Sequence, residues 1–257
     1  MIEVKDLSKR FGEVQVLTDI SAQFYKGKVN QIIGKSGSGK SVLAKCIVGL
    51  HKPEKGQVLY EGHSFHEMTR DEQREIRQRI GMLFQGSALF DSLTVLQNVM
   101  FPLQMFAQLS KSEIEERAHV CLKRVNILDK DGLYPAELSG GMQKRVGIAR
   151  AIAMTPEYLF VDEPNSGLDP QTSILIDDLI KELTEEFNTT TIVITHDMNS
   201  VMETGENIIF IHKGRKWWQG DRDQILNSDN KELNEFIFAG GLMRMVKRNM
   251  DREAGRP

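Results

Sequence analysis

The sequence predicts an α/β protein built around a mainly parallel sheet. Apolar runs bounded by Gly, Pro or Asn alternate with segments whose apolar residues recur every three or four positions, as expected where strands alternate with helices. A glycine-rich loop also joins one apolar run to a helical pattern, which is typical of this fold class. The buried strands that we expect are residues 29–33, 80–84, 158–161, 190–194 and 208–211.

The helical segments carry recognisable start signals. A helical pattern at 40–50 follows the glycine-rich loop, and residues 174–183 have apolar side chains at helical spacing. The segments TRDE at 69–72 and SKSE at 110–113 have the spacing of a capping box, in which each end residue bonds the main-chain N–H of the other. We therefore expect a helix to begin just after Thr69 and another just after Ser110.

The middle of the chain differs from the rest. Residues 88–155 read as consecutive helices without a convincing strand, and we interpret them as a helical lobe inserted in the α/β core. The expected organisation is one unit of residues 1–240 followed by a charged C-terminal tail, residues 241–257. The tail holds five basic residues: Arg244, Lys247, Arg248, Arg252 and Arg256.

Composition excludes several classes of protein. The 257 residues include 33 Lys+Arg and 36 Asp+Glu, and 40% are hydrophobic, which excludes a disordered or fibrous chain. The near-neutral charge argues against non-specific binding of nucleic acid. Cys46 and Cys121 are too few for a disulfide framework and fit a reducing compartment. The charged start MIEVKDLSKRF does not resemble a signal peptide, so we expect no export.

One uncharged stretch, residues 92–110, raises the question of a membrane-spanning segment. Its 19 residues are nearly enough to span a bilayer. It contains Pro102, Asn98 and three glutamines, which an apolar environment would penalise. We interpret it as a segment that contacts protein rather than lipid.

The strongest local signal is the sequence G-x-x-x-x-G-K-S between a predicted strand and a predicted helix. Glycines let the main chain wrap a polyphosphate, and the N–H groups point at it from a helix N-terminus whose dipole favours anions. Lys40 can reach the β- and γ-phosphates, and the Ser41 hydroxyl can ligate Mg²⁺. The predicted nucleotide-binding residues are Gly34, Lys35, Ser36, Gly37, Ser38, Gly39, Lys40 and Ser41.

A second signal is the pair Asp162 and Glu163 after the apolar run YLFV. Because side chains alternate along a strand, we expect the two carboxylates on opposite faces. Asp162 is predicted to hold Mg²⁺, directly or through water, and Glu163 to polarise the attacking water. An apolar run followed by Asp-Glu is by itself more often a strand meeting its loop, so this signal gains weight only beside the glycine-rich loop.

A third signal is the segment LSGG, in which Ser139, Gly140 and Gly141 precede a predicted helix. The start of that helix offers a hydroxyl and free N–H groups, which make a second anion site. A plain capped helix is the alternative. The apolar face of this helix includes Met142, Val146, Ala149 and Ala153.

In their order and spacing these segments resemble the ATPase domain of ABC transporters, over about residues 2–225. Gln85 after the strand IGMLF, the segment SGLD at 166–169, and His196 after the strand TIVIT add to the resemblance. It implies a P-loop NTPase with a RecA-like mixed-sheet core, an antiparallel β subdomain and an inserted helical lobe, with ATP and Mg²⁺ as ligands.

The resemblance also implies a role for each matched residue. Phe11 is similar to the aromatic that stacks on adenine, and Gln85 to the residue that contacts Mg²⁺ and the attacking water. Glu163 would be the catalytic base, and His196 would contact the γ-phosphate. A lone histidine after a strand can equally be structural, and Phe11 could belong to the core. The ATP bound on the other subunit of a homodimer would meet Ser139, Gly140, Gly141 and Asp169.

Finer features are similar to the ATPase subunits of Mla-type phospholipid transporters. These are the LSGGM form, the segment GSALFDSLTVLQNVMFPL and the charged tail. Met142 stands where most of the family has Gln, and Asn165 where Thr is commoner, but neither change removes a catalytic group. The implied place of work is the cytoplasmic face of the inner membrane.

The same resemblance implies partners. A separate integral-membrane permease would dock near Leu89–Phe106, and an MCE-domain lipid-binding protein and a small accessory subunit would complete the system. No nucleic acid is expected. The alternative for the docking segment is that most of its apolar side chains pack the core of the helical lobe. The ones that could form a groove are Leu89, Phe90, Leu93, Val95, Met100, Phe101, Met105 and Phe106.

Three other functions remain open at this point. The chain could energise a small-solute importer, or a lipoprotein-release or efflux system, since neither substrate needs to touch this subunit. A non-transport ABC protein acting in DNA repair, chromosome organisation or translation is disfavoured. Too few residues separate Gly34 from Ser139 to hold a coiled coil, and the sequence has no zinc-spaced cysteines and no basic bias.

Overall fold

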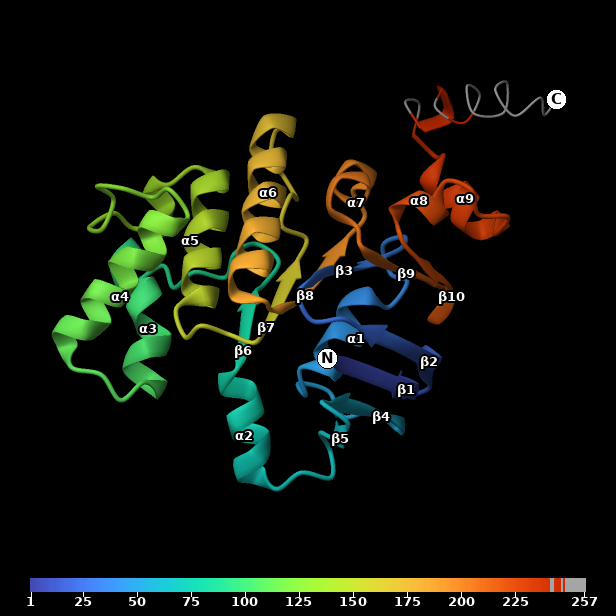
Figure 1. The fold of residues 1–257 in the computed structure, drawn as a ribbon, viewed down its shortest axis with the longest axis horizontal. Helices are drawn as coiled ribbons and strands as arrows, with labels where there is room; N and C mark the ends of the chain where they lie inside the picture. Colours follow the sequence, from blue (N-terminus) through green and yellow to red (C-terminus); the bar gives the residue numbers. More distant parts are fainter. Residues whose placement is uncertain (241–242, 246, 248–257) are drawn as a thin grey trace.

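The computed structural model describes residues 1–240, 243–245 and 247. Two β-sheets and their covering helices lie side by side with a group of helices at one end (Figure 1). Among the described residues, no helix is long and apolar enough to cross a membrane. The part of the predicted tail that includes Arg248, Arg252 and Arg256 lies outside the described residues.

The central sheet is mixed, as predicted. Its six strands lie in the order β10-β9-β3-β8-β7-β6, and only the β9–β10 pair is antiparallel. All five apolar runs predicted as buried strands are strands of this sheet. The bounds are β3 (Lys28–Ile33), β6 (Ile80–Leu83), β7 (Tyr158–Asp162), β8 (Thr190–Thr195), β9 (Asn207–His212) and β10 (Arg215–Gly220).

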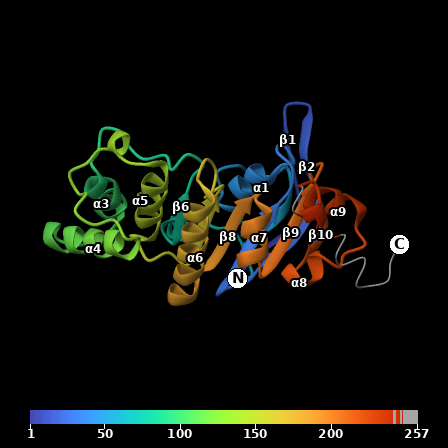
Figure 2. The same cartoon turned by 90° about the horizontal axis from the view of Figure 1, so that it is seen from above.

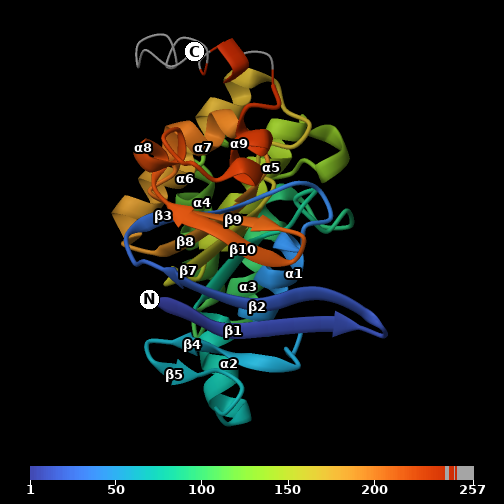
Figure 3. The same ribbon diagram turned by 90° about the vertical axis from the view of Figure 1, so that its right-hand side faces the viewer.

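The second sheet is antiparallel, with the order β2-β1-β4-β5, and confirms the antiparallel subdomain that the family resemblance implied. Its strands are β1 (Ile2–Phe11), β2 (Val14–Phe24), β4 (Lys55–Tyr60) and β5 (His63–Ser64). Helix α1 (Lys40–Ile47) packs between the two sheets, and buried side chains of all three elements form one apolar cluster (Figure 3).

The helices at the left of Figure 1 pack against the edge of the central sheet. Their buried side chains share one cluster with those of α6 and of one face of the sheet. Asn98 is fully buried there, and its amide bonds main-chain groups of Phe90, Leu93 and Thr94 at 2.8–3.2 Å. The bounds are α3 (Val95–Phe106), α4 (Lys111–Arg124), a 3-10 turn (Pro135–Glu137), α5 (Gly140–Ile152) and α6 (Pro170–Phe187).

Both predicted capping boxes form, at Thr69 with Glu72 and at Ser110 with Glu113. They start α2 (Arg70–Gln78) and α4 at the predicted positions. The C-terminal helices pack with α7 against the face of β9, at the end of the molecule opposite α3–α5 (Figure 2). Their bounds are α7 (Met198–Thr204), α8 (Arg222–Ile225) and α9 (Lys231–Ile237).

The topology brings the predicted motifs together. Strands β3, β8, β7 and β6 are neighbours and parallel, so their carboxyl ends meet at one edge of the sheet. Ligands of open α/β sheets bind at this edge. The glycine-rich loop follows β3, His196 follows β8, Glu163 follows β7, and Gln85 lies two residues past the end of β6.

Candidate nucleotide-binding site

The glycine-rich loop has a main-chain shape that only glycine allows at two positions. Gly34 has φ +151°, and an added Cβ would lie 2.2 Å from the Ile211 carbonyl oxygen. Gly39 has φ +105° and caps α1, and its added Cβ would lie 2.6 Å from a methyl group of Leu17. The loop therefore runs tightly against its surroundings while its N–H groups gather at the start of α1.

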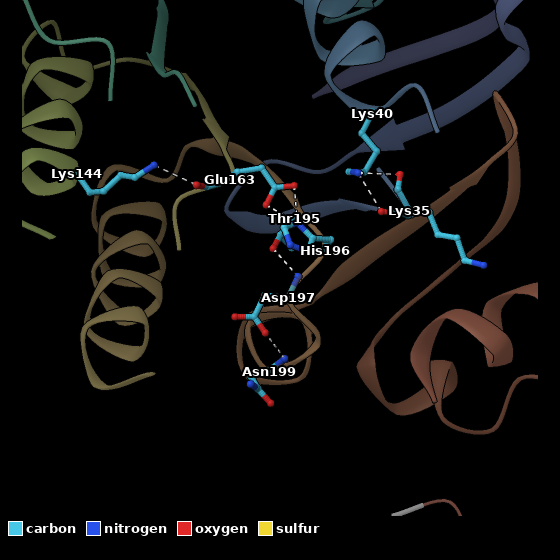
Figure 4. Close-up of polar contacts among 9 residues, drawn as sticks. Lys35, Lys40, Lys144, Glu163, Thr195, His196, Asp197 and Asn199 are labelled. Carbon is cyan, nitrogen blue, oxygen red and sulfur yellow. Dashed lines mark hydrogen bonds and ion pairs between the residues drawn. The ribbon is translucent and has the colours of Figure 1, made fainter. Parts of the chain in front are cut away.

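Lys40 places its ammonium group within the loop. Its Nζ donates to the carbonyl oxygens of Gly34 (2.9 Å) and Lys35 (3.2 Å), as Figure 4 shows. Burial lowers the pKa of Lys40, while the carboxylates of Glu163 and Asp162 act in the opposite direction. A cation held by neutral carbonyls and facing two carboxylates is suited to bind an anion in the loop.

Asp162 is the last residue of β7 and is buried. Burial raises its pKa, the nearby Ser41 hydroxyl opposes this, and Glu163 adds to the increase. Within the described residues, Asp162 Oδ1 has no hydrogen-bond partner. An unsatisfied carboxylate oxygen beside a serine hydroxyl fits a hard divalent cation, which prefers oxygen ligands.

Glu163 lies outside the strand, so the alternation argument does not set its direction. Its φ of +51° is in the left-handed region, and its N–H donates to the Ile194 carbonyl oxygen at 2.9 Å. His196 Nδ1 lies 2.9 Å from one oxygen of the Glu163 carboxylate and 2.8 Å from the other. On the opposite side, Lys144 Nζ donates to the Glu163 carbonyl oxygen at 3.2 Å (Figure 4). The turn that aims Glu163 is thus held from two sides, by β8 with the residue that follows it and by α5.

A cavity of about 920 Å³ lies beside the glycine-rich loop and is lined by Lys40, Glu163 and His196 among others. Gly34, Ser38 and Asp162 are buried and do not line it. Val16 of β2 and Phe236 of α9 also line the cavity, which the sequence motifs did not indicate. The predicted residues that line it are Lys35, Ser36, Gly37, Gly39, Lys40, Ser41, Gln85, Glu163 and His196.

Phe11 is not part of this cavity. It lies at the end of β1, 43% exposed, with its ring 5.2 Å from that of His51 and the Lys9 ammonium 5.0 Å from the ring centre. The ring is therefore exposed rather than an ordinary core residue.

The LSGG segment and Asp169 also lie apart from the cavity. Ser139 caps α5 by accepting from the Met142 N–H (3.3 Å), and Asp169 caps α6 by accepting from the Thr172 N–H (3.0 Å). An added Cβ on Gly141 would lie 2.6 Å from the Thr172 side chain. The two helix starts thus pack closely together and present a second anion-type site away from the first.

A separate apolar groove of about 450 Å³ lies between α2, β6, α3 and the end of α5. Its aromatic lining includes Phe84, Phe90, Phe101 and Phe106, with Arg74, Arg77 and Arg150 alongside. Of the side chains predicted to form a groove, Val95 and Met100 are instead buried in the helical core.

Arg150 connects this groove to the segment after Gln85. Its two guanidinium NH₂ groups donate to the carbonyl oxygens of Ser87 and Ala88, each at 2.9 Å, and its guanidinium lies 5.7 Å from the Phe90 ring centre. Ser87 and Ala88 both have positive φ. One arginine therefore holds the turn that separates Gln85 from the groove.

Sequence reasoning missed Lys144 and Arg150, and also Asp177, a buried residue of α6 that accepts hydrogen bonds from Asn165 and Ser200. Each is a charged residue whose importance lies in a contact with a distant segment. For Asp177 a signal existed, because it falls on the helical face that Ile180 and Thr184 continue, and all three are buried. A carboxylate on a buried face needs a partner.

Comparison with known proteins identifies the family. The family model described as ABC transporter matches residues 17–166. The methionine import ATP-binding protein MetN of Desulfitobacterium hafniense is 40% identical over 242 residues, 92% of this chain and 71% of that protein. The intermembrane phospholipid transport system ATP-binding protein MlaF of Haemophilus influenzae is 36% identical over 237 residues, 92% of this chain and 90% of that protein. The probable ribonucleotide transport ATP-binding protein mkl of Mycobacterium leprae is 35% identical over 236 residues, with coverages of 92% and 68%.

Solved structures agree with the sequence relatives. The dimeric post-hydrolysis state of the ATP-binding cassette MJ0796, bound to ADP and Pi, superposes with a TM-score of 0.79 at 35% identity, covering 86% of this chain and 99% of that one. The cassette cbiO1 of Clostridium perfringens, part of the ABC transporter complex cbiONQ, gives a TM-score of 0.82 at 29% identity, with coverages of 97% and 98%. The chain therefore belongs to the ABC transporter family and is an ATP-binding and ATP-hydrolysing subunit.

Proposed function

We propose that this chain works as a homodimer around two ATP molecules, drives a separate integral-membrane permease, and powers the movement of phospholipid between membranes. The dimer is supported by one observation: two sites suited to bind anions lie apart from each other on one chain. The loop with Lys40 opens on the cavity, whereas the starts of α5 and α6 present Ser139 and Asp169 elsewhere. Two copies related by a two-fold axis can place each site opposite the other.

Within one subunit, the loop N–H groups and Lys40 bind the phosphates of ATP. Ser41, Asp162 and Gln85 would hold Mg²⁺, which neutralises charge on the phosphates when bound. The orphaned Oδ1 of Asp162 and the Ser41 hydroxyl beside it fit that ligand. Phe11 packs against adenine from the end of β1.

Glu163 acts as the base that takes a proton from the attacking water. Its carboxylate is aimed into the cavity by the left-handed turn and is held there by His196. His196 is 63% exposed at the side chain, so it can also reach the γ-phosphate. A general base must lie within hydrogen-bond reach of the proton that it takes, and a carboxylate that lines the cavity is open to a water bound there.

Across the dimer, Ser139, Gly140, Gly141 and Asp169 of one subunit meet the ATP bound to the other. The Ser139 hydroxyl and the first N–H groups of α5 are directed toward the γ-phosphate. ATP therefore holds the two subunits together until hydrolysis removes these contacts.

The permease docks in the aromatic groove of α2, β6, α3 and α5. Phe90 and Phe106 are 42% and 47% exposed, and the neighbouring Arg74 and Arg150 would favour a partner helix with acidic side chains. Docked in this way, the chain would work at the cytoplasmic face of the inner membrane. An MCE-domain lipid-binding protein and a small accessory subunit complete the assembly.

Phospholipid as substrate is supported by the MlaF relative, which aligns over 90% of its own length, and by the LSGGM form of the segment before α5. The test is purification of the chain from its native membrane with its partners, followed by reconstitution into vesicles. We expect a permease and an MCE-domain protein to co-purify, and fluorescent phospholipid to move only with ATP.

Import of a small solute is the second candidate, because the MetN relative is 40% identical. A co-purifying solute-binding protein in place of an MCE-domain protein, together with ATPase stimulation by that loaded protein, would replace the phospholipid assignment. The ATPase cycle described above would be unchanged by that result.

A further inference from the structure

Asp177 is a buried carboxylate in the middle of α6 that joins two other segments. Its Oδ2 accepts from Asn165 Nδ2 at 2.9 Å, and its Oδ1 accepts from the Ser200 hydroxyl at 2.8 Å. All three side chains are at most 8% exposed. The carboxylate thus uses both oxygens to bridge neighbouring segments out of contact with solvent.

The two bridged segments are those that carry the proposed base and the residue that contacts it. Asn165 is two residues after Glu163, and Ser200 is four residues after His196. Glu163 and His196 contact each other directly at the cavity, at 2.8–2.9 Å. Asp177 adds a second link between the same two segments, beneath the first and away from water.

The charge of Asp177 does not favour the stability of the fold. The charged groups that act on Asp177 are Asp197 and Asp178, both of the same sign. A carboxylate buried beside like charges stabilises a fold less than an apolar side chain of similar size. What it supplies is two directed hydrogen bonds with fixed geometry.

We propose that Asp177 is a positioning residue, which fixes the segment of Glu163 against the segment of His196 so that the base and its contact keep one relative placement. The proposal rests on the roles proposed above for Glu163 and His196. It also accounts for Asn165, which stands where threonine is commoner in the family. The longer amide side chain supplies the N–H that reaches Asp177.

The test compares two substitutions in the full-length chain. Asp177→Leu has a similar size and accepts no hydrogen bond, so it breaks both links. Asp177→Asn keeps both, because its amide oxygen can accept from Asn165 and its NH₂ group can donate to the Ser200 oxygen. Asp178→Asn is the matched control, since Asp178 is the exposed neighbour on the same helix.

ATP hydrolysis is measured per binding site, with the sites counted by a fluorescent ATP analogue, so that loss of folded protein does not lower the rate. We expect Asp177→Leu to lower kcat by about tenfold and to change the KM for ATP by less than about twofold, the pattern of a lost transition-state interaction. Asp177→Asn and Asp178→Asn should stay within about twofold of the wild type in both.

An unchanged kcat per site in Asp177→Leu overturns the proposal, and so does an equal loss in Asp177→Asn, because charge rather than hydrogen bonding would then be responsible. If Asp177→Leu does not fold, Ser200→Ala breaks one link alone. A fall in kcat per site of about threefold then supports the proposal, and an unchanged value overturns it. Failure of the proposed function looks different: Glu163→Gln would then hydrolyse ATP as fast as the wild type.

Discussion

Lys144 Nζ donates to the main-chain carbonyl oxygen of Glu163 at 3.2 Å. Lys144 is only 5% exposed, and burial lowers its pKa, which the carboxylates of Asp162 and Glu163 oppose. It lies on α5, the helix that Ser139 caps. The helix that is proposed to meet the partner's ATP thus also holds the turn that aims this subunit's own base.

Replacing Lys144 by methionine should therefore slow hydrolysis. Lys144→Met keeps the buried stem and removes the donor, so the left-handed turn at Glu163 loses one restraint. We expect kcat to fall by about tenfold with little change in the KM for ATP, because the contact does not involve bound nucleotide. Steady-state kinetics check this, with Lys181→Met, an exposed lysine of α6, as control. Equal kcat values for the two variants would contradict the role given to Lys144.

Glu163→Gln should trap the ATP-loaded dimer. The amide cannot take a proton from water, so the γ-phosphate contacts that hold the two subunits together persist. We expect hydrolysis to fall by at least about a hundredfold and a dimer to appear on size-exclusion chromatography only with ATP. The control is Glu163→Gln combined with Ser139→Arg, which should remain monomeric. The same monomer fraction in Glu163→Gln and the wild type would count against the dimer.

Asp177 should make stability fall as pH rises through the range near 6. Burial raises its pKa from the ordinary 3.8 to about 6, with the Asn165 and Ser200 hydrogen bonds opposing and Asp197 and Asp178 adding to the rise. Because the folded pKa exceeds the unfolded one, the folded state binds more protons between about pH 4 and 6. The contribution of this group to stability is therefore present below about pH 4 and lost above about pH 6.

Asp177→Asn removes this pH dependence. We expect its free energy of unfolding at pH 8 to exceed that of the wild type by roughly 2 kcal/mol, a difference that shrinks toward pH 4. Urea denaturation at both pH values measures it, with Asp178→Asn as the exposed control. A difference that is constant with pH would show that Asp177 does not titrate as described.

Phe90→Glu should abolish binding of the permease at the groove without abolishing ATP hydrolysis. A carboxylate at this position disrupts the contact with the Phe101 ring, 4.6 Å away, and the surface offered to the permease, but touches nothing in the nucleotide cavity. We expect ATPase activity of the isolated chain within about threefold of the wild type and loss of permease co-purification. Leu128→Glu is the control, since Leu128 is 55% exposed outside the groove. Retention of the permease by Phe90→Glu would rule out docking there.

The strands that the sequence predicted are continuous apolar runs, such as the fully buried β7, which need no tertiary information to be recognised. The strands β1 and β2 were not predicted, because their pairing has several register shifts, which break the alternation of polar and apolar side chains. β10, with the sequence RKWWQG, has no fully buried side chain and shows no alternation.

The residues of the site also fall into those that a local pattern predicts and those that it does not. Lys40 was predictable because the glycine-rich loop combines particular residue types at short, fixed spacings, and Glu163 because it follows an apolar run elsewhere in a chain that has this loop. Lys144 and Asp177 contact residues 19 and 12 or more positions away. Their partners are set by the packing of α5 and α6, which no local pattern contains.

β6 has the groove on one side of its chain and Gln85 just beyond its end. The strand is only four residues long and is the last of the sheet, paired with β7 alone. Because close-packed interiors transmit strain, a displacement imposed on the groove would act on Gln85 through this short strand. With Arg150 bonding the turn at Ser87 and Ala88, this edge joins the groove to Gln85, which lines the nucleotide cavity, so a partner seated in the groove would have a direct mechanical path to the ATPase site.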